Sequence, residues 1–342
     1  MGSLMLDEAL AAPDVVALQR VRSGVDEQLA ALGRRLQEAP PSLALTVARG
    51  SSDHAANYFA YLVMRRLGVP VTSLPMSLVT LHQAPLQVAG QLAVALSQSG
   101  ASPDVVETMA ALGRAGATTV AFVNDVASPL AAACPHVVPL CAGVERSVAA
   151  TKSFIATLAA VARLVAHWQD DASLLRALAT LPERLSLAAR SDGSRVVDAL
   201  APAQRAIVVG RGLGFAVALE AALKLKETSS LQAEAFSSAE LRHGPMALVD
   251  EGYPVLLFAL RGPEQAGLVE LARDLRRHGA RVILVAPEDV ADRDQTLLVA
   301  DDEALDPIVA IQSFYVAAAE VAEARGHNPD LPRHLAKVTR TR

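Results

Sequence analysis

One arrangement occurs twice in this chain: an apolar run leads directly into a glycine-containing turn, and a helical segment follows the turn. The first apolar run ends in RGSS, residues 49–52, and the second in GRGLG, residues 210–214. Strands that alternate with helices in this way form parallel sheets with helices on both faces. We therefore predict an α/β protein with an internal duplication, in which each half is a parallel sheet flanked by helices as an α-β-α sandwich.

The apolar runs also predict the parts of the chain. The runs of the first half are residues 43–48, 71–74, 92–96, 118–123 and 136–140, and those of the second half are 205–209, 255–260, 281–285 and 295–299. A length of 342 residues favours two domains as well. The predicted parts are an N-terminal helical arm at 1–39, a first domain at 40–170, a linker helix at 171–195, a second domain at 196–326 and a C-terminal tail at 327–342.

Composition and charge exclude several kinds of partner. The net charge is −5 and no cluster of Lys and Arg occurs, which argues against a nucleic acid. The apolar stretch 153–168 is interrupted by Arg163 and is too short to span a bilayer, and the first twenty residues lack the order of a signal peptide. Cys134 and Cys141 lack the spacing of a structural zinc site. We expect a soluble, cytoplasmic protein without a metal site.

Hydroxyl and amide side chains crowd the ends of two predicted strands in the first half. SQSGASP, residues 97–103, places Ser102 at a helix N-cap and Pro103 at the first helical position, and RGSS leaves its strand in the same manner. An isolated Ser-Gly pair is usually only a turn. Two such turns at the carboxyl ends of strands in one sheet favour an anion site. Neither turn matches a nucleotide motif, so we predict a phosphomonoester on a small molecule.

The second half carries a charged stripe on a predicted helix. Glu220, Lys224 and Glu227 fall on one helical face. Such a stripe alone is typical of a solvated face, but the apolar residues around it favour burial, where a carboxylate can act as a base. His243 precedes a Gly-Pro turn at the end of a short predicted helix, where it is accessible to a ligand. A lone histidine is otherwise often a structural hydrogen-bonding group.

These residues lie in motifs that resemble a known family. The motifs are SQSG at 97–100, GVERSVAATKSF at 143–154, ALEAALKLKE at 218–227, AELRHGPMALVD at 239–250 and DLPRHLAKV at 330–338. In this order they resemble the isomerase half of glutamine-fructose-6-phosphate aminotransferase. The resemblance implies two tandem sugar isomerase (SIS) domains.

The resemblance also implies roles for single residues. The residues that would hold the sugar phosphate and its hydroxyls are Ser51, Ser52, Ser97, Gln98, Ser99 and Ser102. Lys224 and Val148 would line the sugar. Glu227 would carry a proton between C1 and C2, His243 would open the ring, and Lys337 would form a Schiff base with the ketose. The family's active site is shared in a homodimer, with the histidine donated by the partner subunit, so a homodimer is implied.

The chain also departs from that family. The glutaminase half is missing and no cysteine follows Met1, so no internal ammonia source is expected. Ala101 and His334 replace a Glu and an Asn of the family's motifs. RGSSDHA at 49–55 and VAATKS at 148–153 are more similar to glutaminase-free relatives, which include the class II glucosamine-6-phosphate deaminases. We predict a deaminase and isomerase that converts glucosamine 6-phosphate and water into fructose 6-phosphate and ammonia, without a metal or organic cofactor.

Three alternatives stay open. The first is the same chemistry on another substrate, such as galactosamine 6-phosphate deamination or fructosamine 6-phosphate deglycation. The second is ammonia-dependent synthesis, the reverse reaction. The third is a sugar-phosphate sensor that binds without turnover, which the joint presence of Glu227, His243 and Lys337 disfavours because binding alone needs none of them.

Overall fold

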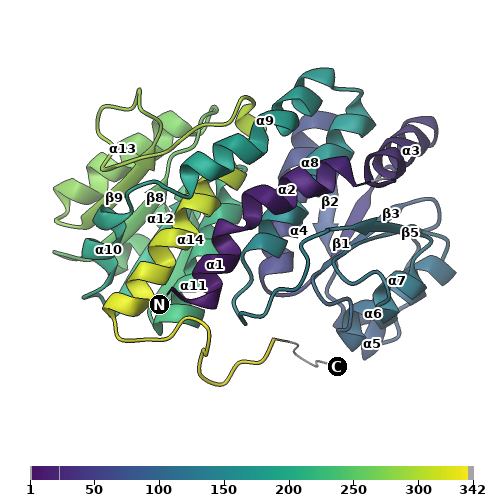
Figure 1. Cartoon of the computed structure of the whole chain (residues 1–342), viewed down its shortest axis with the longest axis horizontal. Helices are drawn as coiled ribbons and strands as arrows, with labels where there is room; N and C mark the ends of the chain where they lie inside the picture. The colour runs from purple at the N-terminus through teal and green to yellow at the C-terminus, as the bar shows by residue number, and fades with distance from the viewer. Residues whose placement is uncertain (1, 23, 338–342) are drawn as a thin grey trace. The chain divides into compact units, whose positions relative to one another are not determined.

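The computed structural model describes residues 2–22 and 24–337, and in this part the chain forms two parallel five-stranded sheets (Figure 1). The first sheet has the strand order β2-β1-β3-β4-β5 and the second has β10-β9-β8-β6-β7. Neighbouring strands pair in parallel in both sheets. The structure thus confirms the predicted α/β class, with two parallel sheets that are each flanked by helices.

The elements follow one another in the order that the alternating pattern predicts. Up to the end of the first sheet they are α1 (Leu4–Leu10), α2 (Ala12–Val21), α3 (Val25–Glu38), β1 (Ala44–Val47), α4 (Ser51–Leu67), β2 (Val71–Ser73), α5 (Ser77–Thr80), β3 (Leu92–Ser97), α6 (Pro103–Arg114), β4 (Thr118–Val123), α7 (Pro129–Ala133) and β5 (His136–Pro139). The later ones are α8 (Lys152–Gln169), α9 (Ala172–Ala188), α10 (Ser194–Leu200), β6 (Arg205–Gly210), α11 (Gly214–Ser229), β7 (Gln232–Ser237), α12 (Ser238–Arg242), η1 (Pro245–Leu248), β8 (Pro254–Phe258), α13 (Gln265–Arg277), β9 (Arg281–Ala286), β10 (Gln295–Thr296), η2 (Glu303–Leu305) and α14 (Asp306–Ala324).

Contacts divide the chain into two compact units, which we name by the sheet that each contains. The first-sheet unit combines residues 14–145, 152–179 and 336–342, and the second-sheet unit combines residues 1–13, 146–151 and 180–335. The last five residues of the predicted tail, 338–342, lie outside the described residues.

The first-sheet unit has a core built from small and branched apolar side chains. Strands β1 and β3 are buried along their whole length, as expected for a parallel sheet covered on both faces. Alternate residues of β1 and β3, such as Val47 and Ala95, pack in one cluster with Val105, Met109 and Leu112 of α6. Helices α4 and α8 pack against each other, and α4 also contacts β1 and β3.

The second-sheet unit repeats this arrangement. Alternate residues of β6, β8 and β9 pack with the apolar side of α13, while α11 contacts β6 and β7 and packs against α14. The segment Glu303–Ala324 is long and apolar enough to cross a membrane by composition, but 83% of its most apolar window is buried inside the protein. It is therefore the core helix of this unit.

Two local features differ from what the apolar pattern indicates. The helical periodicity over residues 14–38 belongs to two helices, since α2 ends at Val21 and α3 begins at Val25, after Gly24 with a φ of 88°. Strand β7 was not predicted, because its sequence QAEAFS has no apolar run. It lies at the edge of its sheet, where polar side chains are tolerated.

Candidate active site

The two hydroxyl-rich turns of the first-sheet unit lie next to each other. Strands β1 and β3 are neighbours, with Val47 opposite Ala95, so the turns that follow them leave the same edge of the sheet. Arg49 of the first turn donates through Nε and Nη2 to Oδ2 of Asp104, at 3.0 and 2.9 Å. Asp104 is in the first turn of α6 and is 1% exposed. The Arg49 side chain is 55% exposed, so this ion pair joins a partly exposed guanidinium to a buried carboxylate and connects one turn to the other.

The second of these turns is fixed by its own hydroxyl groups. Ser97 Oγ accepts a hydrogen bond from the Gly100 N–H at 3.0 Å, and Ser99 Oγ accepts one from the Ala101 N–H at 3.3 Å. Gly100 has a φ of 61°, and a Cβ at this position would lie 2.1 Å from Ser128 Oγ. Only glycine fits there. Ser102 is the N-cap of α6, yet its side chain makes no capping hydrogen bond, so its hydroxyl is not used by the helix end.

The same edge of the sheet carries the N-termini of two helices. Helix α4 has 17 residues and begins at Ser51, and α6 has 12 residues and begins at Pro103. Each helix start presents backbone N–H groups and the positive end of a dipole, which together favour an anion. Together with the serine hydroxyls, the two helix starts form an arrangement suited to a phosphate group.

A buried charged network runs along α11 in the second-sheet unit. The side chains of Glu220 and Lys224 are 0% exposed, and that of Glu227 is 18% exposed. Lys224 Nζ lies 3.4 Å from Glu220 Oε1 and donates a hydrogen bond to Glu227 Oε2. The Tyr315 hydroxyl of α14 donates to Glu220 Oε1 at 3.0 Å. The charged stripe is thus buried, as its apolar surroundings predict.

Lys224 carries the positive charge of this network. Burial disfavours its ammonium form, but the carboxylates of Glu220 and Glu227 outweigh that effect, and together they raise the pKa of Lys224 above its ordinary value. Lys224 therefore stays charged between two carboxylates. Glu227 is the end of the network that reaches the surface, so it is the carboxylate that a substrate can approach.

His243 stands at the end of a short helix, as its position before Gly244-Pro245 predicts. It is the C-cap of α12 and is exposed. It lines a cavity of about 720 Å³ within the second-sheet unit. The other residues of this lining are Arg211, Ser238, Ala239, Arg242, Pro263, Glu264, Gly267 and Glu270. A ligand can therefore reach the imidazole from this cavity.

The remaining predicted residues are distributed over the two units. Lys337 belongs to the first-sheet unit, like the six serine and glutamine positions of the two turns, whereas Val148, Lys224, Glu227 and His243 belong to the second-sheet unit. Lys337 Nζ lies 2.9 Å from Oε2 of Glu145, and Val148 is half-buried. Glu145 lies inside the GVERSVAATKSF motif, but no local pattern marks it as the partner of a residue 192 positions away.

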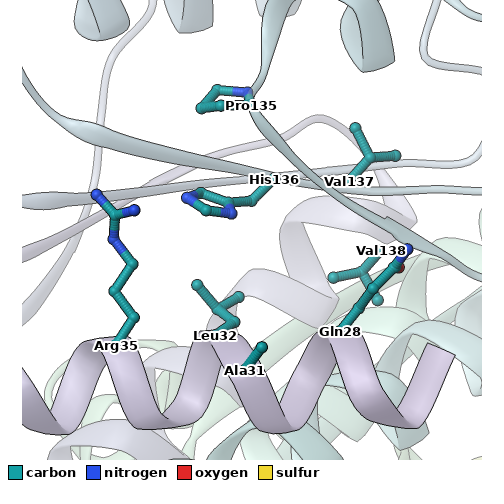
Figure 2. A pocket seen from close by; sticks show the side chains of 8 residues that line it. All are labelled: Gln28, Ala31, Leu32, Arg35, Pro135, His136, Val137 and Val138. Carbon is teal, nitrogen blue, oxygen red and sulfur yellow. The ribbon is translucent and has the colours of Figure 1, made fainter. Parts of the chain in front are cut away.

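A further pocket of about 480 Å³ lies in the first-sheet unit between α3 and β5 (Figure 2). Its lining residues are Gln28, Ala31, Leu32, Arg35, Pro135, His136, Val137 and Val138. Burial and the charge of Arg35 lower the pKa of His136, which favours its neutral form. None of the lining residues is a predicted site residue. Within residues 2–22 and 24–337, no group of three or more His, Cys, Asp or Glu side chains is placed to hold a metal ion.

Comparison with known proteins decides the family. The model of the SIS domain matches residues 42–166 and 199–326, one match on each sheet. The chain belongs to the SIS-domain family. A glutamine–fructose-6-phosphate aminotransferase of Zymomonas mobilis is 33% identical over 311 residues, which cover 85% of this chain and 51% of that protein. The chain thus spans about half the length of the curated relatives that it matches.

Solved structures with this fold include phosphosugar isomerases. A Silicibacter pomeroyi protein provisionally named a phosphosugar isomerase is 40% identical, with a TM-score of 0.90, and the match covers 96% of this chain and 100% of that one. The C-terminal domain of glucosamine-fructose-6-phosphate aminotransferase from Francisella tularensis is 25% identical, with a TM-score of 0.84, and the match covers 97% of this chain and 99% of that one. The chain is therefore related to the isomerase part of the aminotransferase, as its motifs indicate.

Proposed function

We propose that this protein is an amino-sugar-phosphate deaminase and isomerase, which converts glucosamine 6-phosphate and water into fructose 6-phosphate and ammonia. The observation that carries the proposal is the network on α11, in which Glu227 is the accessible carboxylate beside a fully buried Lys224 ammonium. Aldose–ketose interconversion needs one group that takes a proton from C2 and returns it to C1. A carboxylate whose position is fixed by a buried cation is suited to that task.

The proposed reaction begins with opening of the sugar ring, assisted by His243. Glu227 then takes the proton from C2 of the open-chain aldehyde and delivers it to C1, while one proton of the C2 ammonium moves to O1. These two transfers leave an alcohol at C1 and an iminium at C2. Water adds to C2, the C–N bond breaks, and ammonia leaves as the C2 carbonyl of fructose 6-phosphate forms. Lys224 keeps its proton throughout, since the two carboxylates beside it raise its pKa, so that Glu227 is the proton carrier.

The phosphate anchor in this proposal is the pair of turns in the first-sheet unit. Ser51, Ser52, Ser97, Gln98, Ser99 and Ser102 would bind the phosphate and the sugar hydroxyls together with the N-termini of α4 and α6. The tie between Arg49 and Asp104 keeps the two turns in place before the substrate binds. A fixed anchor holds the reacting carbons within reach of the base and lowers the entropic cost of the reaction.

Lys337 and His243 complete the proposed site. Lys337 would form a Schiff base with the ketose or orient its open chain, and Val148 would line the sugar. We also propose a cytoplasmic homodimer in which each subunit receives the histidine of its partner. Sedimentation of the purified protein tests the dimer. A mixture of His243→Asn and Glu227→Gln subunits, each inactive alone, would regain activity if the histidine is donated across the dimer.

The decisive experiment for the reaction is ammonia release from a panel of sugar phosphates. The panel comprises glucosamine 6-phosphate, galactosamine 6-phosphate and fructosamine 6-phosphate, with N-acetylglucosamine 6-phosphate as a control whose amine is blocked. We expect ammonia release from glucosamine 6-phosphate, together with transfer of the hydrogen on C2 of the substrate to C1 of the product. Ammonia release from only galactosamine 6-phosphate or only fructosamine 6-phosphate would support ammonia-releasing activity but assign a different substrate.

Two outcomes would point to a different activity. The first is net synthesis of glucosamine 6-phosphate from fructose 6-phosphate and ammonia at cellular concentrations. It would favour the reverse direction. Tight binding of sugar phosphates without turnover of any of them would favour a sensor and contradict the proposal.

A further inference from the structure

Glu145 is held in a buried position at the start of α8. Its side chain is 0% exposed. Oε1 accepts a hydrogen bond from the Ser153 N–H at 3.1 Å, and Oε2 accepts one from the Ser153 hydroxyl at 2.6 Å. Because α8 begins at Lys152, this N–H belongs to the first turn of an 18-residue helix, where the dipole favours a negative charge. Three features of one helix start therefore fix a carboxylate in one orientation.

The same carboxylate contacts the C-terminal tail. Lys337 Nζ lies 2.9 Å from Oε2 of Glu145, and both residues belong to the first-sheet unit. Residues 333–336 before it are exposed, whereas the Lys337 side chain is only 23% exposed. The contact with Glu145 holds the Lys337 side chain at the end of the described tail. A hydrogen bond between two charged groups is stronger than a neutral one, and here one partner is already immobile.

We propose that Glu145 is a positioning residue, the counter-ion that holds the Lys337 amine for covalent attachment to a ketose phosphate. This inference rests on the role of Lys337 in the proposed function. Lysine has a flexible four-carbon stem and loses rotamer freedom when its amine is held at one point. A carboxylate that is fixed beforehand by Ser153 orders the amine before the sugar arrives, so the cost of ordering is not added to the covalent step.

The covalent step is compatible with an unchanged counter-ion. One proton of the Lys337 ammonium passes to O2 of the ketose, which frees the lone pair of Nζ to form a bond to C2. The C2–O bond then breaks, and the oxygen takes a second proton from the nitrogen and leaves as water. An ammonium group and a carbonyl give a protonated Schiff base and one water molecule. Of the three protons on nitrogen, one stays and two leave in the water, so the charge of +1 is conserved. Glu145 faces a cation before and after the step and keeps its own protonation state.

The test measures the covalent adduct directly. The full chain is incubated with saturating fructose 6-phosphate and borohydride, which reduces the Schiff base, and the rate of adduct formation on Lys337 is read by mass spectrometry. We expect Glu145→Gln to slow adduct formation by about 10- to 100-fold, since the negative charge that faces the Lys337 ammonium is lost. Glu145→Asp should recover part of the rate, because it keeps the charge. Glu107→Gln, an exposed site on α6, is the control and should react like the unaltered protein.

A milder variant keeps the test valid if Glu145→Gln does not fold. Ser153→Ala removes one of the hydrogen bonds to the carboxylate and should slow the adduct by roughly 3- to 10-fold, while the affinity for fructose 6-phosphate stays unchanged. Equal adduct rates in the unaltered protein, Glu145→Gln and Ser153→Ala would overturn the role of Glu145 and leave the proposed function intact. If the unaltered protein releases ammonia but forms no adduct, the proposed roles of Lys337 and Glu145 are both wrong. The proposed deaminase activity is then still supported.

Discussion

The helix that follows the opening strand of each repeat begins with different chemistry. In the first repeat, α4 starts with Ser51 and Ser52. In the second repeat, α11 starts with Gly214 and an apolar turn, and its charged residues lie deeper, around Lys224 and Glu227. Since the sheets and connections are alike, the difference rests on side chains. In the proposed function, one helix binds an anion at its N-terminus, and the other contributes a buried charged network.

The turns themselves show the same contrast. At the start of the second repeat, a Cβ on Gly210 would lie 2.2 Å from the carbonyl oxygen of Gly214, so this turn is closely packed on itself. In the first repeat, a Cβ on Gly50 would meet no atom within 4 Å. The turn of the first repeat therefore has space beside its backbone, as the proposed phosphate anchor requires. In the proposed function, the two repeats of one fold thus divide anchoring and proton transfer between them.

The largest effect is expected from the network of the second repeat. Glu227→Gln removes the proton carrier but keeps the size of the side chain, so kcat should fall by about 10²- to 10⁴-fold. Steady-state ammonia release measures this change. Glu234→Gln, at an exposed position of the edge strand β7, is the matched control and should keep kcat. An unchanged kcat in Glu227→Gln would remove this residue from the mechanism.

The buried Lys224 ammonium of the same network should contribute strongly to the stability of the fold. Lys224→Met leaves the fully buried Glu220 without its cation, which should lower the free energy of unfolding by about 3–5 kcal/mol. Lys226→Met, at an exposed site on the same helix, should change it by less than about 0.5 kcal/mol. Urea unfolding at pH 7 compares the two. Similar losses in both variants would contradict the account of a buried ion network.

The turn of the first repeat should be sensitive to shape. Gly100→Ala places a Cβ 2.1 Å from Ser128 Oγ at a φ of 61°, so it should cost about 1–3 kcal/mol of stability and raise KM. Gly113→Ala is a matched control in α6, because its Cβ would meet only Thr119 at 3.7 Å. That change should be neutral or stabilise the protein by up to about 1 kcal/mol. Thermal unfolding and KM together distinguish the two sites.

The smallest effect is expected from a single anchoring hydroxyl. Ser102→Ala removes a hydroxyl that caps no helix, so stability should hold while KM rises by about 10-fold. Ser128→Ala provides the opposite case, because Ser128 Oγ accepts a hydrogen bond from the Ala131 N–H at the start of α7. It should cost about 1 kcal/mol of stability and leave KM unchanged. A loss of stability without any change of KM in Ser102→Ala would weaken the anchoring role.

The sequence predicts the parts of this structure that depend on local patterns. Apolar runs bounded by turns place β4 over the same residues, 118–123, as the structure does. The spacing of Glu220, Lys224 and Glu227 predicts their common face. Strand β7 is not predicted from the sequence, because it is polar and lies at the edge of its sheet. The contacts of Tyr315 with Glu220 and of Lys337 with Glu145 join residues 95 and 192 positions apart, which no local pattern can reveal.

The division of tasks between the repeats is tested most directly by the affinity for fructose 6-phosphate. Isothermal titration is applied to the unaltered protein, Glu227→Gln and Ser102→Ala. The account predicts that Glu227→Gln keeps its Kd within about 3-fold although it has lost turnover, and that Ser102→Ala raises Kd by about 10-fold while it still turns over. A Kd that rises as strongly in Glu227→Gln, or that stays unchanged in Ser102→Ala, would contradict it.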